Sequence, residues 1–331
     1  MKCLYFILSH TNPVQVVRLV RTLKKSSPSC CVLIHHDYSK TFLDPTDFSA
    51  FSNVNIMSDC IEIKWGDFSV VEALLRSIDW ALTHLDFDWF VFLSGQDYPV
   101  KPVIEIETFL DKCGYDALLR GFLVEHRNSW PDGEGVRRYY FRYYELPRFN
   151  YYYRMPVVFK TLFSHLKVLF NKYQPLIQIR TLPRGLPPCI GLKLFGVPFN
   201  SKFHCFGGPT WFDASRRCIE YVRHFSKVNP EYVAWYKRTF LPDESFVATI
   251  LLNQSQFKIL LENKRYVHWN PADPYASSPR VIQSDDLDEV FKWGAHFARK
   301  FDMGLDTHVL DLIDNYVGLS TVNTGPGECD L

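Results

Sequence analysis

The chain lacks an excess of charge of either sign. Its 331 residues include 37 Lys and Arg against 36 Asp and Glu, a formal net charge of +1. Proteins that follow nucleic-acid phosphates carry a basic excess, so this balance argues against a nucleic-acid partner. Hydrophobic residues make up 47% of the chain. That share excludes disorder and collagen-like or coiled-coil architectures, and the length permits a large buried core.

Cysteine motifs are also absent. The nine cysteines are an odd number and include no C-x-x-C spacing, so neither a disulfide framework nor a zinc cluster is predicted. We expect reduced thiols in a reducing compartment, most of them small core residues.

No hydrophobic run is long enough to cross a membrane. The opening apolar run, residues 3–8, ends at Ser9 and His10, far short of the roughly 20 residues of a span. It also lacks the small-residue cleavage site of a signal peptide. We interpret it as a buried first strand and expect a cytoplasmic protein, with peripheral association at the membrane left open.

The common phosphate-binding and hydrolase motifs are missing. A dinucleotide fingerprint requires G-x-G-x-x-G after the first strand, whereas here the turn reads Ser9-His10-Thr11-Asn12-Pro13. No P-loop and no G-x-S-x-G elbow occur. These absences argue against NAD-dependent dehydrogenases, P-loop enzymes and α/β-hydrolases.

A convincing metal site is missing as well. Asp86-Phe87-Asp88 has the D-x-D spelling of many sugar-nucleotide transferases, but it precedes the predicted strand 89–93 and so lies at the amino end. Asp97, at the carboxyl end, is a single carboxylate, too few for a magnesium site. We therefore expect no metal cofactor, and expect cationic side chains to neutralise any departing diphosphate.

The pattern that is present alternates strands and helices. Apolar strands are predicted at 2–9, 31–35 and 89–93, with a β-rich segment at 54–63 and helices beginning near Pro13 and Val70. This order predicts an open, mostly parallel α/β sheet with flanking helices. Ligands bind such sheets beyond the carboxyl ends of the strands. Three polar clusters fall there: His10-Thr11-Asn12, His36-Asp37 and Ser94-Gly95-Gln96-Asp97.

The aromatic content, 27 Phe, 18 Tyr and 8 Trp, divides into two populations. Phe and Trp on strand and helix faces are expected in the core. Tyrosines cluster between Tyr139 and Tyr153, in an irregular region that also holds an amphipathic stretch at 157–170. A tyrosine offers a flat apolar face and a hydroxyl, so we expect this region to line an acceptor cleft, with Tyr143 as a binding residue. Its arginines, Arg142, Arg148 and Arg154, also suit an anionic polymer or a membrane surface.

The last third of the chain regains regular patterns. They predict two helices after residue 212, a strand at 266–269 and a final helix through 297–302.

Seven motifs, spread in order over nearly the whole chain, carry a family resemblance. They are Ile7-Leu8-Ser9-His10-Thr11-Asn12-Pro13, Ile34-His35-His36-Asp37, Trp65-Gly66, Leu93-Ser94-Gly95-Gln96-Asp97-Tyr98-Pro99, Gly208-Pro209-Thr210-Trp211-Phe212, Pro242-Asp243-Glu244-Ser245-Phe246 and Phe297-Ala298-Arg299-Lys300-Phe301-Asp302. Together they resemble the Core-2/I-branching glycosyltransferases (glycosyltransferase family 14), which include the peptide O-xylosyltransferases. The chain looks like a soluble bacterial member.

The resemblance implies one GT-A type domain over residues 1–320, followed by a tail at 321–331. Residues 1–120 would bind the nucleotide sugar, 121–200 would form the aromatic-rich acceptor side, and 201–320 would carry the catalytic base and the diphosphate contacts.

The implied reaction is inverting, metal-independent transfer from a UDP-sugar to a glycan hydroxyl. UDP-N-acetylglucosamine is the favoured donor, the product is β-linked, and the expected setting is surface polysaccharide synthesis. The alternatives are an enzyme like the peptide O-xylosyltransferases using UDP-xylose, and a non-catalytic UDP-sugar-binding protein of the same fold.

The resemblance also assigns residues to the reaction. Glu244 matches the family's catalytic base; the alternative is that Asp243 and Glu244 are acids in the first turn of the helix predicted at 246–252. Lys300 matches the lysine that contacts the diphosphate. Arg280 is its expected partner, with Arg299 and Arg265 as alternatives.

Further residues are expected to line the donor and acceptor sites. Asp37 suits recognition of uridine or ribose hydroxyls. His10 and Asp97 are expected to line the donor site, although His10 is equally explained as a structural imidazole. Three tryptophans offer apolar faces for sugar rings or, alternatively, belong to the core: Trp65, Trp211 and Trp269.

Overall fold

The computed structural model describes residues 1–126, 128, 130–131, 133–146, 156–181, 187–193, 196–269 and 278–319. Tyr151, Tyr152, Tyr153, Arg148, Arg154 and the predicted tail at 321–331 therefore lie outside the described residues.

A seven-stranded sheet forms the centre of the molecule, in the order β13-β6-β12-β4-β1-β2-β3. The parallel strands β1, β2, β3 and β4 span Cys3–Ser9, Cys31–His36, Val54–Ile56 and Trp89–Ser94. On the other side of β4, β12 (Asp213–Ser215) is antiparallel to both β4 and β6 (Ala117–Leu118), and β13 (Ile259–Leu260) is parallel to β6. The predicted open and mostly parallel α/β sheet is confirmed.

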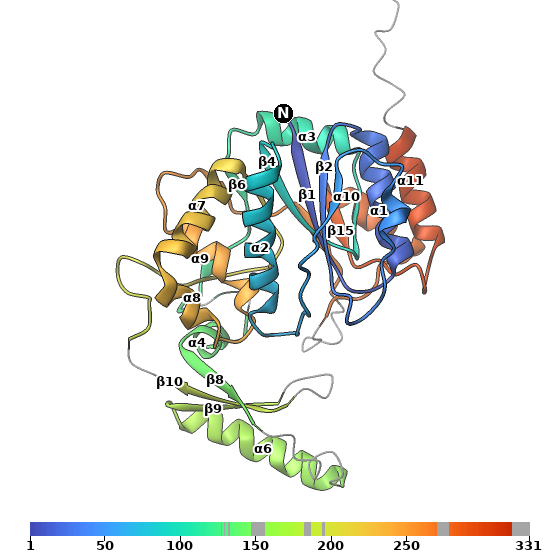
Figure 1. Cartoon of the computed structure of the whole chain (residues 1–331). Helices are drawn as coiled ribbons and strands as arrows, with labels where there is room; N and C mark the ends of the chain where they lie inside the picture. Colours follow the sequence, from blue (N-terminus) through green and yellow to red (C-terminus); the bar gives the residue numbers. More distant parts are fainter. Residues whose placement is uncertain are drawn as a thin grey trace, which may run out of the picture.

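Helices cover both faces of this sheet, as Figure 1 shows. One face carries α1 (Pro13–Ser26), α3 (Val103–Lys112), α10 (Leu287–Trp293) and α11 (His308–Leu319). The other carries α2 (Ser69–His84), α7 (Arg216–Val228), α8 (Pro230–Tyr236) and α9 (Phe246–Leu252). Alternate residues of β1 join two different hydrophobic clusters, with Phe6 in one and Tyr5 in the other. All seven residues of β1 are buried, which explains its continuous apolar sequence.

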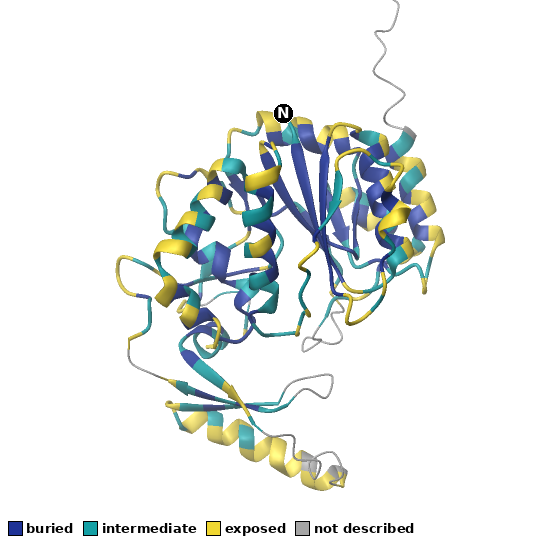
Figure 2. Ribbon diagram, viewed as in Figure 1, coloured by how far each residue is buried: buried dark blue, intermediate teal, exposed yellow. Residues whose placement is uncertain are grey.

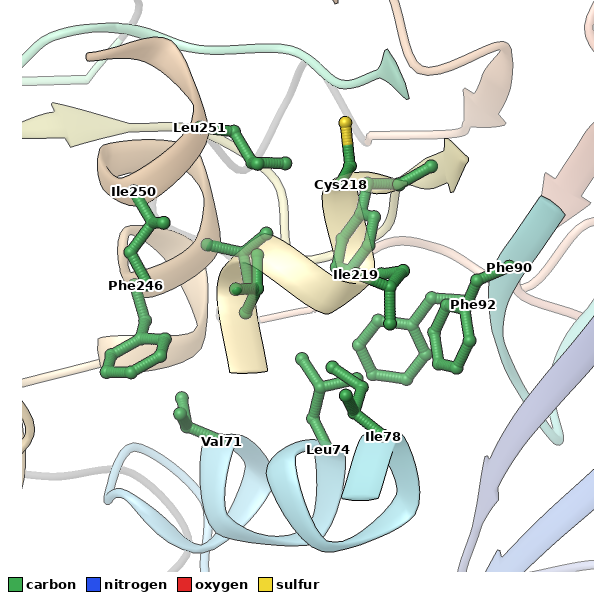
Figure 3. Packing of buried hydrophobic residues seen from close by; sticks show 14 of the residues in the cluster. Val71, Leu74, Ile78, Phe90, Phe92, Cys218, Ile219, Phe246, Ile250 and Leu251 are labelled. Carbon is green, nitrogen blue, oxygen red and sulfur yellow. The ribbon is translucent and has the colours of Figure 1, made fainter. Parts of the chain in front are cut away.

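Helix α9 is anchored deep in one of these clusters. Figure 3 shows Phe246, Ile250 and Leu251 of α9 in the same cluster as residues of α2, α7 and β4. Because α9 follows directly on the 3-10 turn η2 (Pro242–Glu244), this packing fixes the position of Glu244.

A three-stranded sheet lies beside the main one and corrects a prediction. It contains β14 (Arg265–Val267), β15 (Phe297–Arg299) and β5 (Asp97–Pro99), with β15 in the middle. The final helix predicted through 297–302 is therefore wrong, because the fully buried Phe297 and Ala298 lie in a central strand. The last helix within the described residues is α11. The strand predicted at 266–269 ends at Val267.

The β-rich segment predicted at 54–63 is also shorter than expected. Strand β3 ends at Ile56, and two later backbone N–H groups are bonded by side chains instead of by a neighbouring strand. Ile61 donates to Nε2 of His35 at 3.0 Å, and Ile63 donates to Oδ2 of Asp37 at 2.9 Å.

The described elements of residues 121–200 form a layer at one end of the molecule, here called the 121–200 layer (Figure 1). Its elements are α4 (Glu134–Tyr139), β8 (Phe141–Glu145), α6 (Val157–Tyr173), β9 (Ile177–Arg180) and β10 (Cys189–Lys193), with the antiparallel sheet order β8-β10-β9. A two-stranded pair, β7 (Phe122–Leu123) and β11 (Phe206–Gly207), connects this layer to the core. Tyr139 is fully buried against Trp130 and Tyr236, so its assignment to the acceptor side is wrong and it is a core residue.

The remaining short elements are the 3-10 turns η1 (Pro45–Phe48) and η3 (Ser284–Asp286). Eight cysteines fall within the described ranges, all of them free thiols and six of them buried, as predicted. Among the residues that the structure describes, no helix has the length and apolar character needed to span a bilayer.

Candidate active site

The three predicted polar clusters meet at one edge of the main sheet. The register pairs Ser9 of β1 with His36 of β2, and Leu8 of β1 with Ser94 of β4. Hydrogen bonds connect the strand ends: Ser9 Oγ lies 2.8 Å from Nδ1 of His36, and the Gly95 N–H donates to the Leu8 carbonyl at 3.0 Å. The prediction that these clusters share one edge is confirmed.

Asp37 is buried at this edge and holds a neighbouring loop. Its carboxylate accepts hydrogen bonds from the backbone N–H groups of Ser39 and Ile63, both at 2.9 Å. Burial alone would raise the pKa of this carboxyl, but the hydrogen bonds outweigh it and lower the pKa. Its contact with ribose or uridine hydroxyls stays a prediction.

His10 lies at the exit of β1 and is exposed, with its carbonyl accepting from Thr41 Oγ1 at 3.2 Å. Asn12 occupies the N-cap position of α1, but its side chain does not cap that helix and donates instead to Asp302 at 2.7 Å. The first motif is thereby joined to the last.

Asp97, Arg299 and Trp211 form a stack at the carboxyl end of β4. Nε of Arg299 lies 2.9 Å from Oδ1 of the fully buried Asp97, and its guanidinium sits 4.3 Å from the ring centroid of Trp211. The Ser94 N–H donates to the other oxygen of Asp97. Arg299 is thus already paired and stacked, while Trp211 is half-buried under it. Asp97 and Trp211, both predicted as site residues, thus both contact Arg299.

The Trp211 motif connects this stack to the predicted base. Thr210 Oγ1 donates to Oδ2 of Asp243 at 2.6 Å, and the Gly208 N–H donates to the carbonyl of Glu244 at 2.8 Å. A Cβ on Gly208 would lie only 2.0 Å from the carbonyl oxygen of Arg120, so this approach requires glycine. The row running from Asp97 through Arg299 and Trp211 to Glu244 therefore joins four motifs that are far apart in sequence.

Glu244 itself is held by a network of charged side chains. Arg138 of α4 donates from Nη1 to Oε2 of Glu244 at 2.5 Å and from Nε to Glu134 at 2.9 Å. Arg180 of β9 donates to the same oxygen of Glu134 at 3.0 Å. The Glu244 side chain keeps 27% of its surface exposed, and no hydrogen bond to its Oε1 occurs among the described residues. One oxygen is therefore fixed and the other can be reached.

Burial and the neighbouring carboxylates raise the pKa of Glu244, and Arg138 lowers it. Desolvation raises the pKa of Glu244 to about 7, the neighbouring Asp243 adds to the rise, and Arg138 opposes it. A base with a pKa near 7 is well matched to proton transfer at neutral pH. The alternative helix-capping role has less support, because the N-cap of α9 is Ser245 and neither Asp243 nor Glu244 lies in the first turn of that helix.

The four candidate cations differ in their surroundings. Arg265 is buried and paired with Asp213, its Nη1 lying 3.1 Å from Oδ2, and Arg299 is paired as described above. Arg280 keeps 39% of its side-chain surface exposed and contacts Asp286 and His268. The carbonyl of Lys300 accepts from the Ile282 N–H at 2.8 Å, which brings the Arg280 segment beside Lys300.

The aromatic candidates also differ in their exposure and in the residues they contact. Trp269 follows β14 and is 53% exposed. Trp65 packs edge-on against Phe240, with ring centroids 5.7 Å apart. Tyr143 of β8 donates to the Arg137 carbonyl at 2.5 Å and accepts from Arg180 at 2.8 Å. Its hydroxyl therefore supports the network behind Glu244.

The D-x-D sequence lies where it was predicted, away from this site. Asp86 is 94% exposed, and Asp88 accepts from the backbone N–H of Lys2 at 2.7 Å, at the amino end of β4. No group of three or more His, Cys, Asp or Glu side chains suited to a metal ion occurs within the described ranges.

Sequence reasoning missed Arg138, Glu134 and Arg180. The i,i+4 spacing of Glu134 and Arg138 is a helical ion-pair signal that could have singled them out. Arg180 comes from another element, and no local signal marks it.

The family model for the Core-2/I-Branching enzyme matches residues 5–129 and 165–291. The chain belongs to this family. The predicted resemblance is confirmed, and the protein is a glycosyltransferase.

Two curated relatives illustrate the range of similarity. The chain is 23% identical over 94% of its length to a beta-1,3-galactosyl-O-glycosyl-glycoprotein beta-1,6-N-acetylglucosaminyltransferase 4 of Danio rerio, covering 68% of that protein. It is 24% identical over 81% of its length to xylosyltransferase 1 of Rattus norvegicus, covering 29% of that protein. The chain thus spans about two thirds of the first relative and less than a third of the second.

Among solved structures, HddC from Yersinia pseudotuberculosis complexed with GMP-PN aligns with 11% identity and a TM-score of 0.28, covering 66% of this chain and 79% of that one. A likeness of that size carries no argument about the fold or the ligand of this protein.

Proposed function

We propose that this protein is an inverting, metal-independent glycosyltransferase that moves a sugar from a UDP-sugar to a hydroxyl of a glycan. The observation that carries the proposal is Glu244: a half-buried carboxylate with a pKa raised to about 7, one oxygen held by Arg138, in a row that leads to the carboxyl edge of the sheet.

Glu244 would act as the general base. Its carboxylate takes the proton of the acceptor hydroxyl as that oxygen attacks the anomeric carbon of the donor. The new carbon–oxygen bond forms on the face opposite the bond to the diphosphate, which breaks with both electrons leaving on UDP. An α-linked donor then gives a β-linked product.

Cationic side chains would stabilise the departing diphosphate. Lys300 and Arg280 are brought near one another by the hydrogen bond between Ile282 and Lys300, and the side chain of Arg280 is partly exposed. Charge of this kind at the leaving group substitutes for a divalent ion. Arg265 and Arg299 are less suited to this role, because each is committed to a buried carboxylate.

UDP-N-acetylglucosamine is the favoured donor, in keeping with the relative aligned over 94% of the chain. UDP-xylose is the second candidate, favoured by the xylosyltransferase relative. We place the acceptor in a glycan, with surface polysaccharide synthesis as the setting.

The experiment is to incubate the purified protein with each UDP-sugar and a panel of glycan acceptors in EDTA and to measure UDP release. We expect acceptor-dependent release with one of the two donors. Activity that requires added manganese would overturn the metal-free mechanism. Calorimetric UDP binding without any transfer to an acceptor would favour the non-catalytic binding protein instead.

A further inference from the structure

Helix α6 is attached to the rest of the protein by its polar side. Lys167 Nζ donates to Thr181 Oγ1 at 2.7 Å. One turn later, the Asn171 side chain donates to the carbonyl of Ile179 at 2.9 Å and accepts from the N–H of the same residue at 2.8 Å. Gln174, just beyond the helix, accepts from the Ile177 N–H at 2.8 Å.

These contacts cover the free edge of β9. The Asn171 amide pairs with both backbone groups of Ile179 as a neighbouring strand would, which blocks further strand pairing there. The polar residues recur at i, i+4 and i+7, so they form one stripe along the helix, and that stripe faces the protein.

The apolar residues of α6 are therefore turned outward. In Figure 2 the helix is mostly in the colour of exposed residues. The exposed fractions include 59% for Phe159, 55% for Leu162 and 55% for Leu166. The exposed apolar side chains on and just after the helix are Val158, Phe159, Leu162, Phe163, Leu166, Val168, Leu169, Phe170, Tyr173 and Leu176.

This orientation is the reverse of that of an ordinary surface helix, which buries its apolar stripe against the core. An exposed patch of ten apolar side chains marks a surface that a lipid membrane or another protein covers. The attachment stripe is made by polar side chains, so the fold presents the helix with its apolar side exposed to solvent.

The charge of the helix indicates what covers it. The α6 sequence contains three lysines and one histidine but no aspartate or glutamate. With 17 residues it is about 25 Å long, too short to cross a hydrocarbon core of about 30 Å. Apolar and aromatic residues with lysines, on a helix that cannot span, are typical of a helix lying in the plane of a lipid interface.

We propose that α6 docks this protein on a membrane surface that contains anionic phospholipids. The apolar stripe enters the boundary between headgroups and acyl chains, and Lys172, which is exposed and lies outside the attachment stripe, lies among the headgroup phosphates. A second copy of the chain is a poorer occupant, because α6 offers no acidic side chain that could pair with the exposed Lys172 of the other copy.

The test is co-sedimentation of the full chain with vesicles of phosphatidylcholine alone and of phosphatidylcholine mixed with phosphatidylglycerol. We expect binding to the mixed vesicles that weakens as salt is added. Substituting Phe159→Ser together with Leu162→Ser should lower the partition coefficient by about 100-fold, since each side chain loses its burial in lipid. Lys172→Glu should lower it by about tenfold on mixed vesicles and much less on neutral ones.

Leu305→Ser serves as the matched control, because Leu305 is 66% exposed and lies outside α6; we expect it to leave vesicle binding unchanged. Thermal unfolding of each variant checks that the fold is retained. The proposal is overturned if the chain does not bind mixed vesicles, if Phe159→Ser with Leu162→Ser binds as well as the parent, or if analytical ultracentrifugation shows a lipid-free dimer that this variant dissolves. None of these measurements uses transferase activity.

Discussion

Arg138 donates a hydrogen bond to Oε2 of Glu244 at 2.5 Å, across a separation of 106 residues. The same guanidinium lies 4.2 Å from the ring centroid of Trp130 and contacts Glu134. The arginine thus fixes one oxygen of the carboxylate from the side of the 121–200 layer, while α9 fixes its backbone from the core. The pKa of Glu244 is set by this competition between burial and the cation.

Removing Arg138 should shift the pH dependence of the reaction. Arg138 lowers the pKa of Glu244 against the effect of burial, so Arg138→Gln should raise that pKa by about one unit or more. Because the base must be deprotonated, the acidic limb of kcat/KM should move to higher pH and activity at neutral pH should fall about tenfold. Arg138→Lys keeps the charge and should shift the limb less. A limb that stays in place in Arg138→Gln would show that Glu244 is not the titrating base.

Glu244→Gln should abolish turnover and leave donor binding intact. The amide keeps the shape of the side chain but cannot accept the proton, and general base catalysis typically contributes about 10²–10⁴-fold. We expect kcat to fall by that factor while calorimetry gives an unchanged affinity for UDP. The control is Glu220→Gln, at a 54% exposed position on α7 paired with Arg216. Comparable activity in Glu244→Gln and the parent would place the base elsewhere.

Lys300→Ala and Arg280→Ala should each weaken UDP binding about tenfold, since a hydrogen bond to a charged group contributes roughly 1.5–3 kcal/mol. Binding of uridine, which has no diphosphate, should change little. Lys292→Ala, at an exposed position near the end of α10, is the matched control. Equal losses for uridine and UDP would indicate a disturbed fold and not a lost diphosphate contact.

The arrangement of the main sheet could be predicted because each of its long strands is marked by a pattern within a short stretch of sequence. Continuous apolar runs such as 89–93 bounded by polar residues indicate buried parallel strands, and the topology then brings their carboxyl ends together. The run from Phe297 to Asp302 was mistaken for a helix because a short apolar segment has no periodicity that separates a helix from a buried strand. Only its pairing with β14 and β5 decides the outcome.

The candidate site was predicted in its motifs but not in its network. Glu244 and Lys300 carry recognisable local sequences. Arg138 reaches Glu244 across 106 residues, and Arg180 reaches Glu134 across 46. Contacts between residues so far apart in the sequence depend on how the 121–200 layer packs against the core, and no short sequence pattern predicts that packing. The free apolar face of α6 escaped prediction for the same reason, because the sequence shows amphipathicity but not which side faces the protein.

Arg265→Met should destabilise the fold by roughly 3–5 kcal/mol, because it leaves the buried carboxylate of Asp213 without its partner. Chemical denaturation measures this loss. Arg265→Met combined with Asp213→Leu should recover part of it. The control is Arg76→Met, which removes an exposed pair with Glu72 and should cost about 1 kcal/mol or less. If folded Arg265→Met binds UDP more weakly than the parent while its stability is unchanged, Arg265 belongs to the diphosphate site.

Glu134 should make the stability of the protein fall in acid. Burial alone would raise its pKa, but Arg180 and Arg138 outweigh burial and lower the pKa from 4.5 to about 2. A carboxyl whose pKa is lower in the folded state stabilises the fold above its unfolded pKa, and this contribution is lost as pH falls from about 4.5 toward 2.

Glu134→Gln should therefore cost roughly 3 kcal/mol at neutral pH, and the difference from the parent should shrink as the pH falls below about 4.5. Urea denaturation of both proteins across this range measures the effect, with Glu220→Gln as the exposed control. A difference that does not change with pH would mean that the loss comes from packing and not from the charge of Glu134. Arg138 contacts both Glu134 and Glu244, and the negative charge of Glu134 raises the pKa of Glu244. Glu134→Gln should therefore also lower the pKa of Glu244 and move the acidic limb of kcat/KM to lower pH.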